Sequence, residues 1–264
     1  MRLAGKIGIV VGAGQTPGDT IGNGRAAALL FAREGAKLLL VDRSLKSAEE
    51  TAAMIAKGGG TARCFEGDWT RAADCRAYAK ACLDAWGRID FLHNNVGIGN
   101  GDAGPATVTE DAYDRIMGVN LKGCLLSCQA VMPAMQAQEA GSIVNISSLA
   151  AIAATPLTAY KLSKAGMNAL GQSLALANAK FGVRVNTIAP GLMDTPMAIE
   201  GQSASQQISK DELRARRDRS VPLRGKMGSA WDVACAALFL HSEEARFITG
   251  VLLPVDGGQS AKIG

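Results

Sequence analysis

Tyr160 and Lys164 are the residues of this sequence whose types and spacing point most directly to chemistry. They lie four residues apart in a stretch of helical periodicity, so we expect both side chains on one helical face. An ammonium group beside a phenol favours the phenolate and lowers the pKa of the tyrosine. Such a tyrosine can exchange a proton with an alcohol oxygen as a general acid/base. Because such pairs also occur by chance on surface helices, the argument depends on the elements around them.

Short β-branched segments alternate with segments of helical periodicity along nearly the whole chain. The predicted strands are continuously apolar, which is typical of parallel strands buried on both faces. This pattern predicts a doubly wound α/β fold, a parallel sheet of the Rossmann type in a single domain, 1–264. We predict strands at 6–11, 37–41, 61–65, 89–93, 142–147, 183–188 and 251–255, and helices near 22–34, 44–57, 70–86, 109–136, 157–181 and 229–241. Ligands bind such sheets at the carboxyl ends of the strands, so the residues that follow each strand are candidate site residues.

A glycine-rich segment follows the first predicted strand and precedes an alanine-rich helix. Glycines allow a tight turn and the close approach of a pyrophosphate, which the free amides of the helix N-terminus can hold. Asp42 ends the second strand twenty residues after Gly22, the offset at which a carboxylate binds an adenosine ribose. These features together predict a dinucleotide site. Its candidate residues in this half of the chain are Gly12, Gly14, Gln15, Gly22, Asn23, Gly24, Asp42, Arg43, Asp68, Trp69 and Asn94.

The choice of dinucleotide depends on Asp42 and Arg43. The Asp42 carboxylate would repel a ribose 2′-phosphate, which favours NAD(H) over NADP(H). Arg43 is compatible with either cofactor, because an arginine can pair with that phosphate or stack on adenine. A role for Asp42 as the cap of the helix that begins near Ser44 would not exclude ribose binding.

The ordered set of these residues resembles the short-chain dehydrogenase/reductase family over essentially the whole chain. Each motif is weak alone, but their order is specific to this family. The resemblance is carried by the glycine-rich segment, Asp42, Asp68, Asn94-Asn95-Val96-Gly97, Asn120, Ser147-Ser148, Tyr160 with Lys164, Pro190-Gly191 and Asp256-Gly257-Gly258.

The resemblance implies that hydride passes directly between the substrate carbinol carbon and the nicotinamide ring, while Tyr160 exchanges the proton on the substrate oxygen. Lys164 would bind the nicotinamide ribose and lower the pKa of the phenol. A serine would polarise the carbonyl, and Asn120 would hold a water on a proton path to solvent. Pro190, Met193 and Thr195 fall where the family binds the nicotinamide. The implied activity is the NAD(H)-dependent interconversion of a secondary alcohol and a ketone, with NADPH-dependent reduction of a 3-oxoacyl thioester as the alternative.

The sequence departs from the family pattern in two places. Nine residues separate Gly12 from Gly22, which implies an insertion of about six residues, Thr16 to Ile21, in the phosphate loop. The insertion could cover the pyrophosphate or form a solvated bulge without a role. The position of the serine is also ambiguous: family spacing to Tyr160 selects Ser147, whereas the end of the strand motif selects Ser148. We favour Ser148, because a strand end is a firmer anchor than a loop length.

Composition excludes several other classes of protein. Apolar residues make up 48% and charged residues 20% of 264 residues, with no stretch of eighteen apolar residues, so we expect a soluble protein without a membrane span. The six cysteines show no C-x-x-C motif and there are two histidines, so we expect no metal site and a cytoplasmic location. A net charge of +4 without a basic stripe argues against nucleic acid as a partner.

Residues 192–228 are the least regular part of the chain, and the family places a mobile lid over the substrate here. The expected pocket, with residues such as Ile98, Leu149 and Met197, is mostly apolar and admits a neutral or an acidic small-molecule alcohol or ketone. The basic residues of the lid form either a solvated face or a site for an anionic substrate. They are Lys210, Arg214, Arg216, Arg217, Arg219, Arg224 and Lys226.

Two further expectations concern turnover and assembly. A cofactor-sensing binding protein with this fold is the alternative to an enzyme, but such proteins usually lose the tyrosine or the lysine, and both are present. Small residues along 109–136 and 157–181, such as Gly166 and Ala169, suit close packing across a two-fold axis. Relatives form homotetramers through these helices, so we expect a homotetramer.

Overall fold

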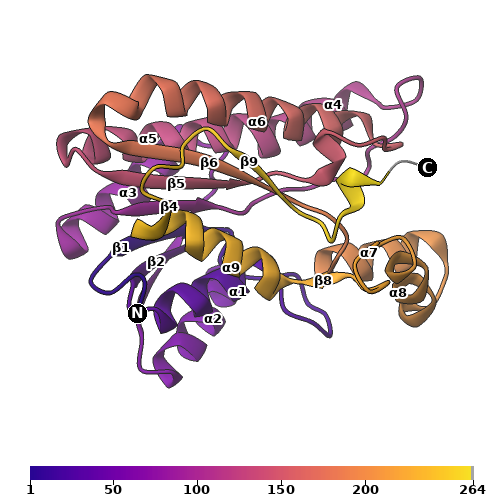
Figure 1. Cartoon of the computed structure of the whole chain (residues 1–264), viewed down its shortest axis with the longest axis horizontal. Helices are drawn as coiled ribbons and strands as arrows, with labels where there is room; N and C mark the ends of the chain where they lie inside the picture. The colour runs from indigo at the N-terminus through magenta and orange to yellow at the C-terminus, as the bar shows by residue number, and fades with distance from the viewer. Residues whose placement is uncertain (263–264) are drawn as a thin grey trace.

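The core of the structure, a computed structural model that describes residues 1–262, is a seven-stranded sheet in which all strands are parallel. The strand order is β3-β2-β1-β4-β5-β6-β9, so the direction of winding reverses between β1 and β4 (Figure 1). This arrangement confirms the predicted doubly wound α/β fold. The strands are β1 (Ile7–Val11), β2 (Lys37–Asp42), β3 (Thr61–Glu66), β4 (Phe91–Asn94), β5 (Gly141–Ile146), β6 (Val183–Pro190) and β9 (Leu252–Val255).

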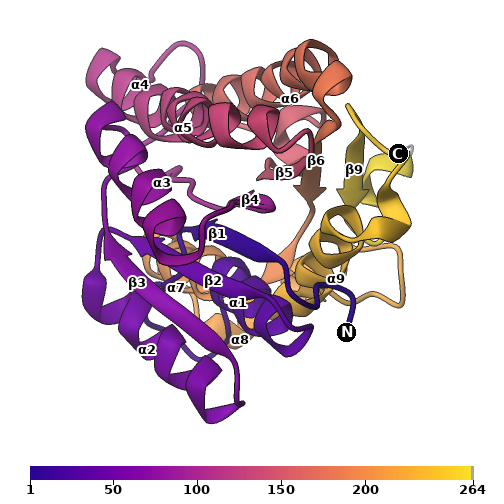
Figure 2. The same ribbon diagram turned by 90° about the vertical axis from the view of Figure 1, so that its left-hand side faces the viewer.

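Helices cover both faces of the sheet, as the continuous burial of β1 and β4 requires. The two views in Figures 1 and 2 show α1, α2 and α9 on one face and α3, α4, α5 and α6 on the other. Across residues 1–262, no helix combines the length and apolar character needed to cross a bilayer. The helices are α1 (Asn23–Arg33), α2 (Leu45–Lys57), α3 (Ala72–Trp86), α4 (Glu110–Met117), α5 (Gly123–Ala137), α6 (Thr158–Asn178) and α9 (Ala230–His241).

The structure differs from the sequence-based prediction in two segments. The predicted helix at 109–136 is divided into α4 and α5 by a turn of π-helix, Gly118–Lys122. The irregular segment 192–228, which we call the lid, contains α7 (Pro196–Gln206) and α8 (Lys210–Asp218), with the short strands β7 (Met193–Asp194) and β8 (Gly228–Ser229) paired at its ends. Both helices have local start signals that the sequence-based prediction did not use, a proline at the first turn of α7 and the Ser209 cap of α8.

The two histidines of the chain lie in the core beneath α1 and α9. His93 and His241 are buried, and both rings pack edge-on against Phe31 with centroids 5.3 and 5.4 Å away. Burial lowers the pKa of His93 to about 3 and that of His241 well below its ordinary value. Both side chains are therefore neutral in the folded chain near neutral pH.

The neutral histidines predict an acid-sensitive fold. In the unfolded chain each histidine binds a proton below about pH 6.5, while the folded chain does not, so stability is greatest above that pH and is lost as the pH falls. The expected slope is up to about 1.4 kcal/mol per pH unit for each histidine. Urea unfolding of wild type and His93→Leu at pH 7.5 and 5.5 measures it. In His93→Leu the difference in unfolding free energy between the two pH values should be about half that of wild type. An unchanged difference would contradict the assignment of a neutral, buried His93.

Candidate active site

Tyr160 and Lys164 lie in the first two turns of α6, at the carboxyl end of the sheet. The Lys164 side chain is 2% exposed, and its Nζ donates a hydrogen bond of 2.8 Å to the carbonyl oxygen of Ile146 at the end of β5. The same Nζ lies 5.9 Å from the centroid of the Tyr160 ring. The structure therefore brings the phenol and the ammonium group to one face of α6, at the end of a central strand.

The electrostatics of Tyr160 differ from the sequence-based expectation. Burial raises the pKa of the Tyr160 phenol, and a hydrogen bond with Ser148 offsets this only in part. Burial also lowers the pKa of Lys164 to about 8. The ammonium group is directed at the Ile146 carbonyl, so in the chain without cofactor desolvation outweighs its attraction for a phenolate. Tyr160 is thus a neutral phenol, able to donate a proton at neutral pH.

The two candidate serines have different surroundings. The Ser147 hydroxyl is buried and donates a hydrogen bond of 3.2 Å to the backbone oxygen of Lys164. The Ser148 hydroxyl lies beside the Tyr160 phenol, where it lowers the pKa of that phenol, and it accepts from the amide of Ala150 at 3.2 Å. Ser147 therefore attaches α6 to β5, while Ser148 faces the phenol, a geometry that favours Ser148 as the substrate-polarising residue.

Asn120 lies in the π-helical turn between α4 and α5, a distortion that often marks a functional site. Its fully buried side chain bonds to both backbone groups of Ile98, at 2.8 and 2.9 Å, and donates to the Ser163 hydroxyl at 3.0 Å. A Cβ at Gly97 would lie 2.9 Å from Lys164 Nζ and 3.8 Å from Asn120 Oδ1. The glycine thus keeps the space between the lysine and the asparagine free of a side chain.

The turn between β1 and α1 has the features that a pyrophosphate site requires. Gly12 has a φ of +79°, and a Cβ at Gly24 would lie 1.9 Å from the Gly12 carbonyl oxygen, so strand and helix pack in direct backbone contact. Helix α1 begins at Asn23, and the preceding residue, Gly22, provides no side-chain cap. Within residues 1–262, the Thr20 hydroxyl and the Asn23 side-chain oxygen are buried there without a partner. A pyrophosphate fits this turn, because the site offers unpaired polar groups at a helix N-terminus.

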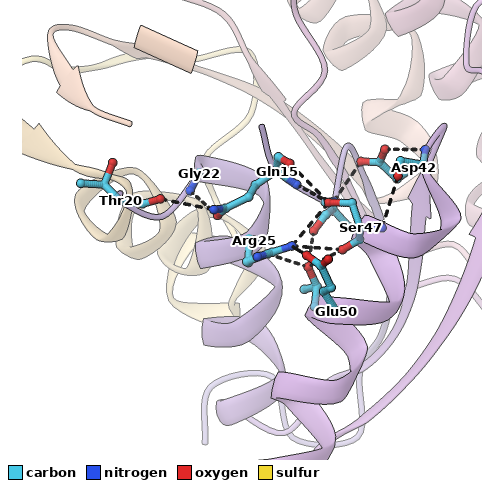
Figure 3. Close-up of polar contacts among 11 residues, drawn as sticks. Gln15, Thr20, Gly22, Arg25, Asp42, Ser47 and Glu50 are labelled. Atoms are coloured by element: carbon cyan, nitrogen blue, oxygen red, sulfur yellow. Dashed lines mark hydrogen bonds and ion pairs between the residues drawn. The ribbon is translucent and has the colours of Figure 1, made fainter. Parts of the chain in front are cut away.

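Gln15 and Asp42 fix the shape of this loop (Figure 3). The Gln15 side chain accepts from the amide of Gly22 at 3.0 Å and donates to the carbonyl oxygen of Thr20 at 3.3 Å, which closes the base of the insertion. The Asp42 carboxylate accepts from the amides of Gly14 and Ser44 at 2.9 and 3.0 Å. Gln15 is therefore engaged within the loop, whereas Asp42 ends β2 beside the turn, where a ribose would follow the pyrophosphate.

Sequence reasoning missed Ser47 and Arg25, which brace the same loop from α2 and α1. The Ser47 hydroxyl accepts from the Gln15 amide at 2.9 Å, and the buried Arg25 side chain bonds to Thr51 and Glu50 (Figure 3). The only feature of the sequence that could have indicated this role is the small polar residue Ser47 in the first turn of α2. These contacts hold the glycine-rich turn in place before any ligand binds.

The inserted segment docks on the lid. A Cβ at Gly18 would lie 2.6 Å from Glu200 Oε1 and 2.8 Å from Pro196 Cβ, so the insertion touches α7. Lys210 of α8 forms ion pairs with Asp19 of the insertion at 3.0 Å and with Glu200 at 2.7 Å. Residues 16–19 are exposed, but the insertion is not isolated, because Gly18 and Asp19 connect the phosphate loop to the lid.

A cavity of about 370 Å³ lies at the carboxyl ends of β2 and β3. Arg43, which follows Asp42 in sequence, is among its lining residues together with Asp68 and Arg71. The Asp68 carboxylate accepts from the amide and hydroxyl of Thr70 at 2.9 and 2.8 Å. The Trp69 side chain is 3% exposed and packs against Gly123 of α5, so only its backbone can reach a ligand. The cavity suits an adenosine.

The remaining predicted residues lie on the β4 side of the point between β1 and β4 at which the direction of winding reverses. The buried Asn94 amide donates to Asn145 Oδ1 at 2.9 Å and thereby ties β4 to β5. Pro190 ends β6, Met193 is in β7, and Thr195 precedes α7; the last two are buried. Gln259, which the sequence did not suggest, fixes the start of the lid by accepting from the Leu192 amide at 2.8 Å.

Three of the seven predicted basic residues in the lid pair with carboxylates. Arg214 pairs with Asp194 at 3.2 Å, and Lys226 with Asp218 at 2.9 Å, in addition to the contacts of Lys210. Arg217 is 9% exposed, and its guanidinium donates to Gln202 Oε1 at 2.9 Å and to the Met193 carbonyl oxygen at 3.4 Å. These four residues stabilise the lid internally, whereas Arg216, Arg219 and Arg224 are exposed and form no ion pair within residues 1–262.

Comparison with known proteins identifies relatives over the full length. Residues 19–260 match a family model described as enoyl-(acyl carrier protein) reductase. The chain is 37% identical to 2-(S)-hydroxypropyl-CoM dehydrogenase 3 of Xanthobacter autotrophicus, over 92% of this chain and 94% of the relative. It is 34% identical to a 3-oxoacyl-(acyl-carrier-protein) reductase of Thermotoga maritima, over 98% of this chain and 99% of the relative.

Comparison with solved structures leads to the same family. A short-chain dehydrogenase/reductase of Burkholderia xenovorans superposes with a TM-score of 0.93 at 38% identity, covering 100% of this chain and 99% of the other. Levodione reductase superposes with the same TM-score at 29% identity, covering 99% of this chain and 100% of the other. With the Tyr160–Lys164 pair at the carboxyl end of a doubly wound sheet, these matches establish that the chain belongs to the short-chain dehydrogenase/reductase family of oxidoreductases.

Proposed function

We propose that the protein is an NAD(H)-dependent oxidoreductase that interconverts a secondary alcohol and a ketone. The observation that carries the proposal is the grouping of Ser148, Tyr160 and Lys164 at the carboxyl end of the sheet. Phenol, hydroxyl and buried ammonium form a proton-handling site beside the glycine-rich turn, and that combination suits the reduction of a carbonyl group or the reverse reaction.

Each residue of the group has a distinct role in the proposed reaction. Ser148 donates a hydrogen bond to the substrate oxygen and polarises the carbonyl. Tyr160, a neutral phenol whose pKa is raised by burial, gives its proton to that oxygen in the reduction and takes it back in the oxidation. Lys164 holds the nicotinamide ribose and, as a cation below about pH 8, stabilises negative charge on the tyrosine oxygen during transfer.

A bound nicotinamide supplies the hydride or accepts it. Residues of this chain that would hold the cofactor are the glycine-rich turn for the pyrophosphate, Asp42 for the adenosine ribose, and Met193 and Thr195 for the nicotinamide. The free acceptor capacity of the Asp42 carboxylate, which accepts two amide bonds in the structure, favours a 2′-hydroxyl over a 2′-phosphate. Asn120 and Lys164 both approach Gly97, and this proximity suits a water-mediated proton path from the lysine.

NADPH-dependent reduction of a 3-oxoacyl thioester is the second candidate. It is favoured by the arginines Arg43 and Arg71 at the adenosine cavity and by the Thermotoga maritima relative named as an acyl-carrier-protein reductase. Arginine binds phosphate groups well, so a 2′-phosphate could be held there despite Asp42.

The decisive experiment compares cofactors and substrates directly. Dissociation constants of NADH and NADPH are measured by fluorescence titration, and a panel of neutral and acidic secondary alcohols is screened for reduction of NAD⁺ and NADP⁺ at 340 nm. We expect tighter binding of NADH, because Asp42 disfavours a 2′-phosphate, and turnover of neutral alcohols, because Lys210, Arg214 and Lys226 of the lid are already paired with carboxylates. Tighter NADPH with turnover of 3-oxoacyl thioesters would overturn the assignment in favour of the second candidate.

We also propose that the enzyme is a cytoplasmic homotetramer. An apolar hollow of about 560 Å³, bounded by Met117, Leu121, Leu125 and Leu170, lies on the outer face of α4, α5 and α6. All six cysteines are free thiols, as a reducing compartment would allow. Light scattering with size-exclusion chromatography tests the assembly, and a monomer with normal activity would contradict it.

A further inference from the structure

The loop that follows β4 contains an acidic residue directed at the start of the catalytic helix. The Asp102 carboxylate accepts hydrogen bonds from the backbone amides of Tyr160 at 2.7 Å and Ala159 at 3.1 Å. Its Oδ1 also accepts from the amide of Ala103 at 2.8 Å, which fixes the carboxylate within its own loop. Asp102, which is more than fifty residues away in sequence, thus accepts hydrogen bonds from two amides of the first turn of α6.

Helix α6 needs such an acceptor because it lacks one of its own. The residue before its first turn is Leu157, whose side chain cannot accept a hydrogen bond. Helices α2, α4 and α8 instead begin after Ser44, Thr109 and Ser209, each of which caps its own helix. In α6 the third free amide, that of Thr158, donates to the carbonyl oxygen of Ala103 at 3.0 Å. The amides of the first three residues of α6 are therefore all bonded to one loop.

The same loop also surrounds the tyrosine side chain. A Cβ at Gly99 would lie 3.2 Å from Tyr160 Cδ2, so the loop backbone packs directly against the phenol ring. The carboxylate thus fixes the backbone of Tyr160 while Gly99 restricts its ring. Burial raises the pKa of Tyr160 and the Ser148 hydroxyl offsets this in part, whereas Asp102 contributes through backbone placement.

We propose that Asp102 is a positioning residue for the reaction: it fixes the first turn of α6 so that the Tyr160 phenol is held where the substrate oxygen binds. This inference rests on the proposed function. A fixed proton donor matters because small misplacements of reacting groups are costly, about 100-fold in rate for 1 Å. Without Asp102 two amides of the first turn would lose their acceptor, and Tyr160 would sample several positions.

The test combines Asp102→Ala, Asp102→Asn and a matched control. Asp102→Ala should lower kcat about 10- to 100-fold while the dissociation constant of NADH changes less than about threefold. Asp102→Asn keeps one acceptor oxygen and should recover much of kcat. The control Thr109→Ala removes the cap of α4; we expect a similar loss in Tm with kcat unchanged. The apparent pKa values of the pH–rate profile should be the same in all variants, because the carboxylate acts by placement.

A second measurement does not depend on turnover. Hydrogen–deuterium exchange of a peptide spanning 157–164 should be faster in Asp102→Ala than in wild type and unchanged in Thr109→Ala. The inference is overturned if Asp102→Ala has the kcat of the Thr109→Ala control, or if cofactor binding is lost together with kcat. If wild type oxidises no alcohol, the proposed function fails, and faster exchange in Asp102→Ala then shows a structural cap without a catalytic role.

Discussion

Replacement of Tyr160 by phenylalanine should reduce kcat by about 1000-fold or more, because it removes the proton donor and keeps the ring. The phenylalanine ring can still pack against Gly99, so the fold and the dissociation constant of NADH should change little. Steady-state kinetics at 340 nm and fluorescence titration measure the two quantities. The matched control is Tyr113→Phe in α4, which removes a phenol from a 36% exposed side chain and should leave kcat unchanged.

The pH dependence of the wild type adds a second readout. Because burial raises the pKa of Tyr160, the phenol is protonated at neutral pH and ready to donate a proton, so reduction should be efficient there. Oxidation needs a proton acceptor and should become faster as the pH rises. If Tyr160→Phe kept kcat within tenfold of wild type, another group would have to carry the proton. A wild-type chain that binds NADH without any turnover would instead indicate a cofactor-sensing protein.

Replacement of Lys164 by methionine should reduce kcat by about 100- to 1000-fold and also weaken cofactor binding. Methionine occupies the space of the aliphatic part of the lysine side chain but removes the charge and the hydrogen bond to the carbonyl oxygen of Ile146. The lysine of wild type is cationic below about pH 8, so its affinity for the cofactor should decline above that pH. The affinity of the variant should not show this decline. Titration of NADH from pH 6 to 9.5 measures this.

Stability separates a catalytic loss from misfolding in this variant. Lys164 is a buried cation without a carboxylate partner among its hydrogen bonds, and its desolvation cost disappears in Lys164→Met. The Tm of the variant should therefore be at least that of wild type. Lys180→Met, near the carboxyl end of α6, is the control and should change neither kcat nor affinity. A variant with normal kcat would show that the ammonium group has no part in proton transfer.

Sequence reasoning was most successful where burial alone determines structure. The seven sheet strands were predicted within about two residues, because continuous apolar segments such as Ile7–Val11 have no other stable place than the inside of a parallel sheet. The polar segments were harder. Helices α7 and α8 pack through ion pairs and few apolar contacts, so their periodicity gave a weak signal, and the π-helical turn at Asn120 has no sequence signature.

The candidate site was predictable in its residue types but not in its geometry. Tyr160, Lys164 and Asp42 follow from spacing, whereas the choice between Ser147 and Ser148 depends on which hydroxyl faces the phenol. The expected lowering of the Tyr160 pKa was wrong for the chain without cofactor, because sequence cannot give the burial of both groups or the direction of the ammonium group. Asp102 was missed since its contacts join residues more than fifty positions apart.

The ion pairs of Lys210 with Asp19 and Glu200 have a kinetic consequence for the proposed enzyme. The insertion borders the proposed pyrophosphate turn and contacts the lid, so we expect release of the nucleotide to be coupled to movement of the lid. Asp19 is 63% exposed, and dissolved salt therefore weakens the junction. The residence time of the nucleotide should shorten as ionic strength rises, and Lys210→Ala should remove most of that salt sensitivity.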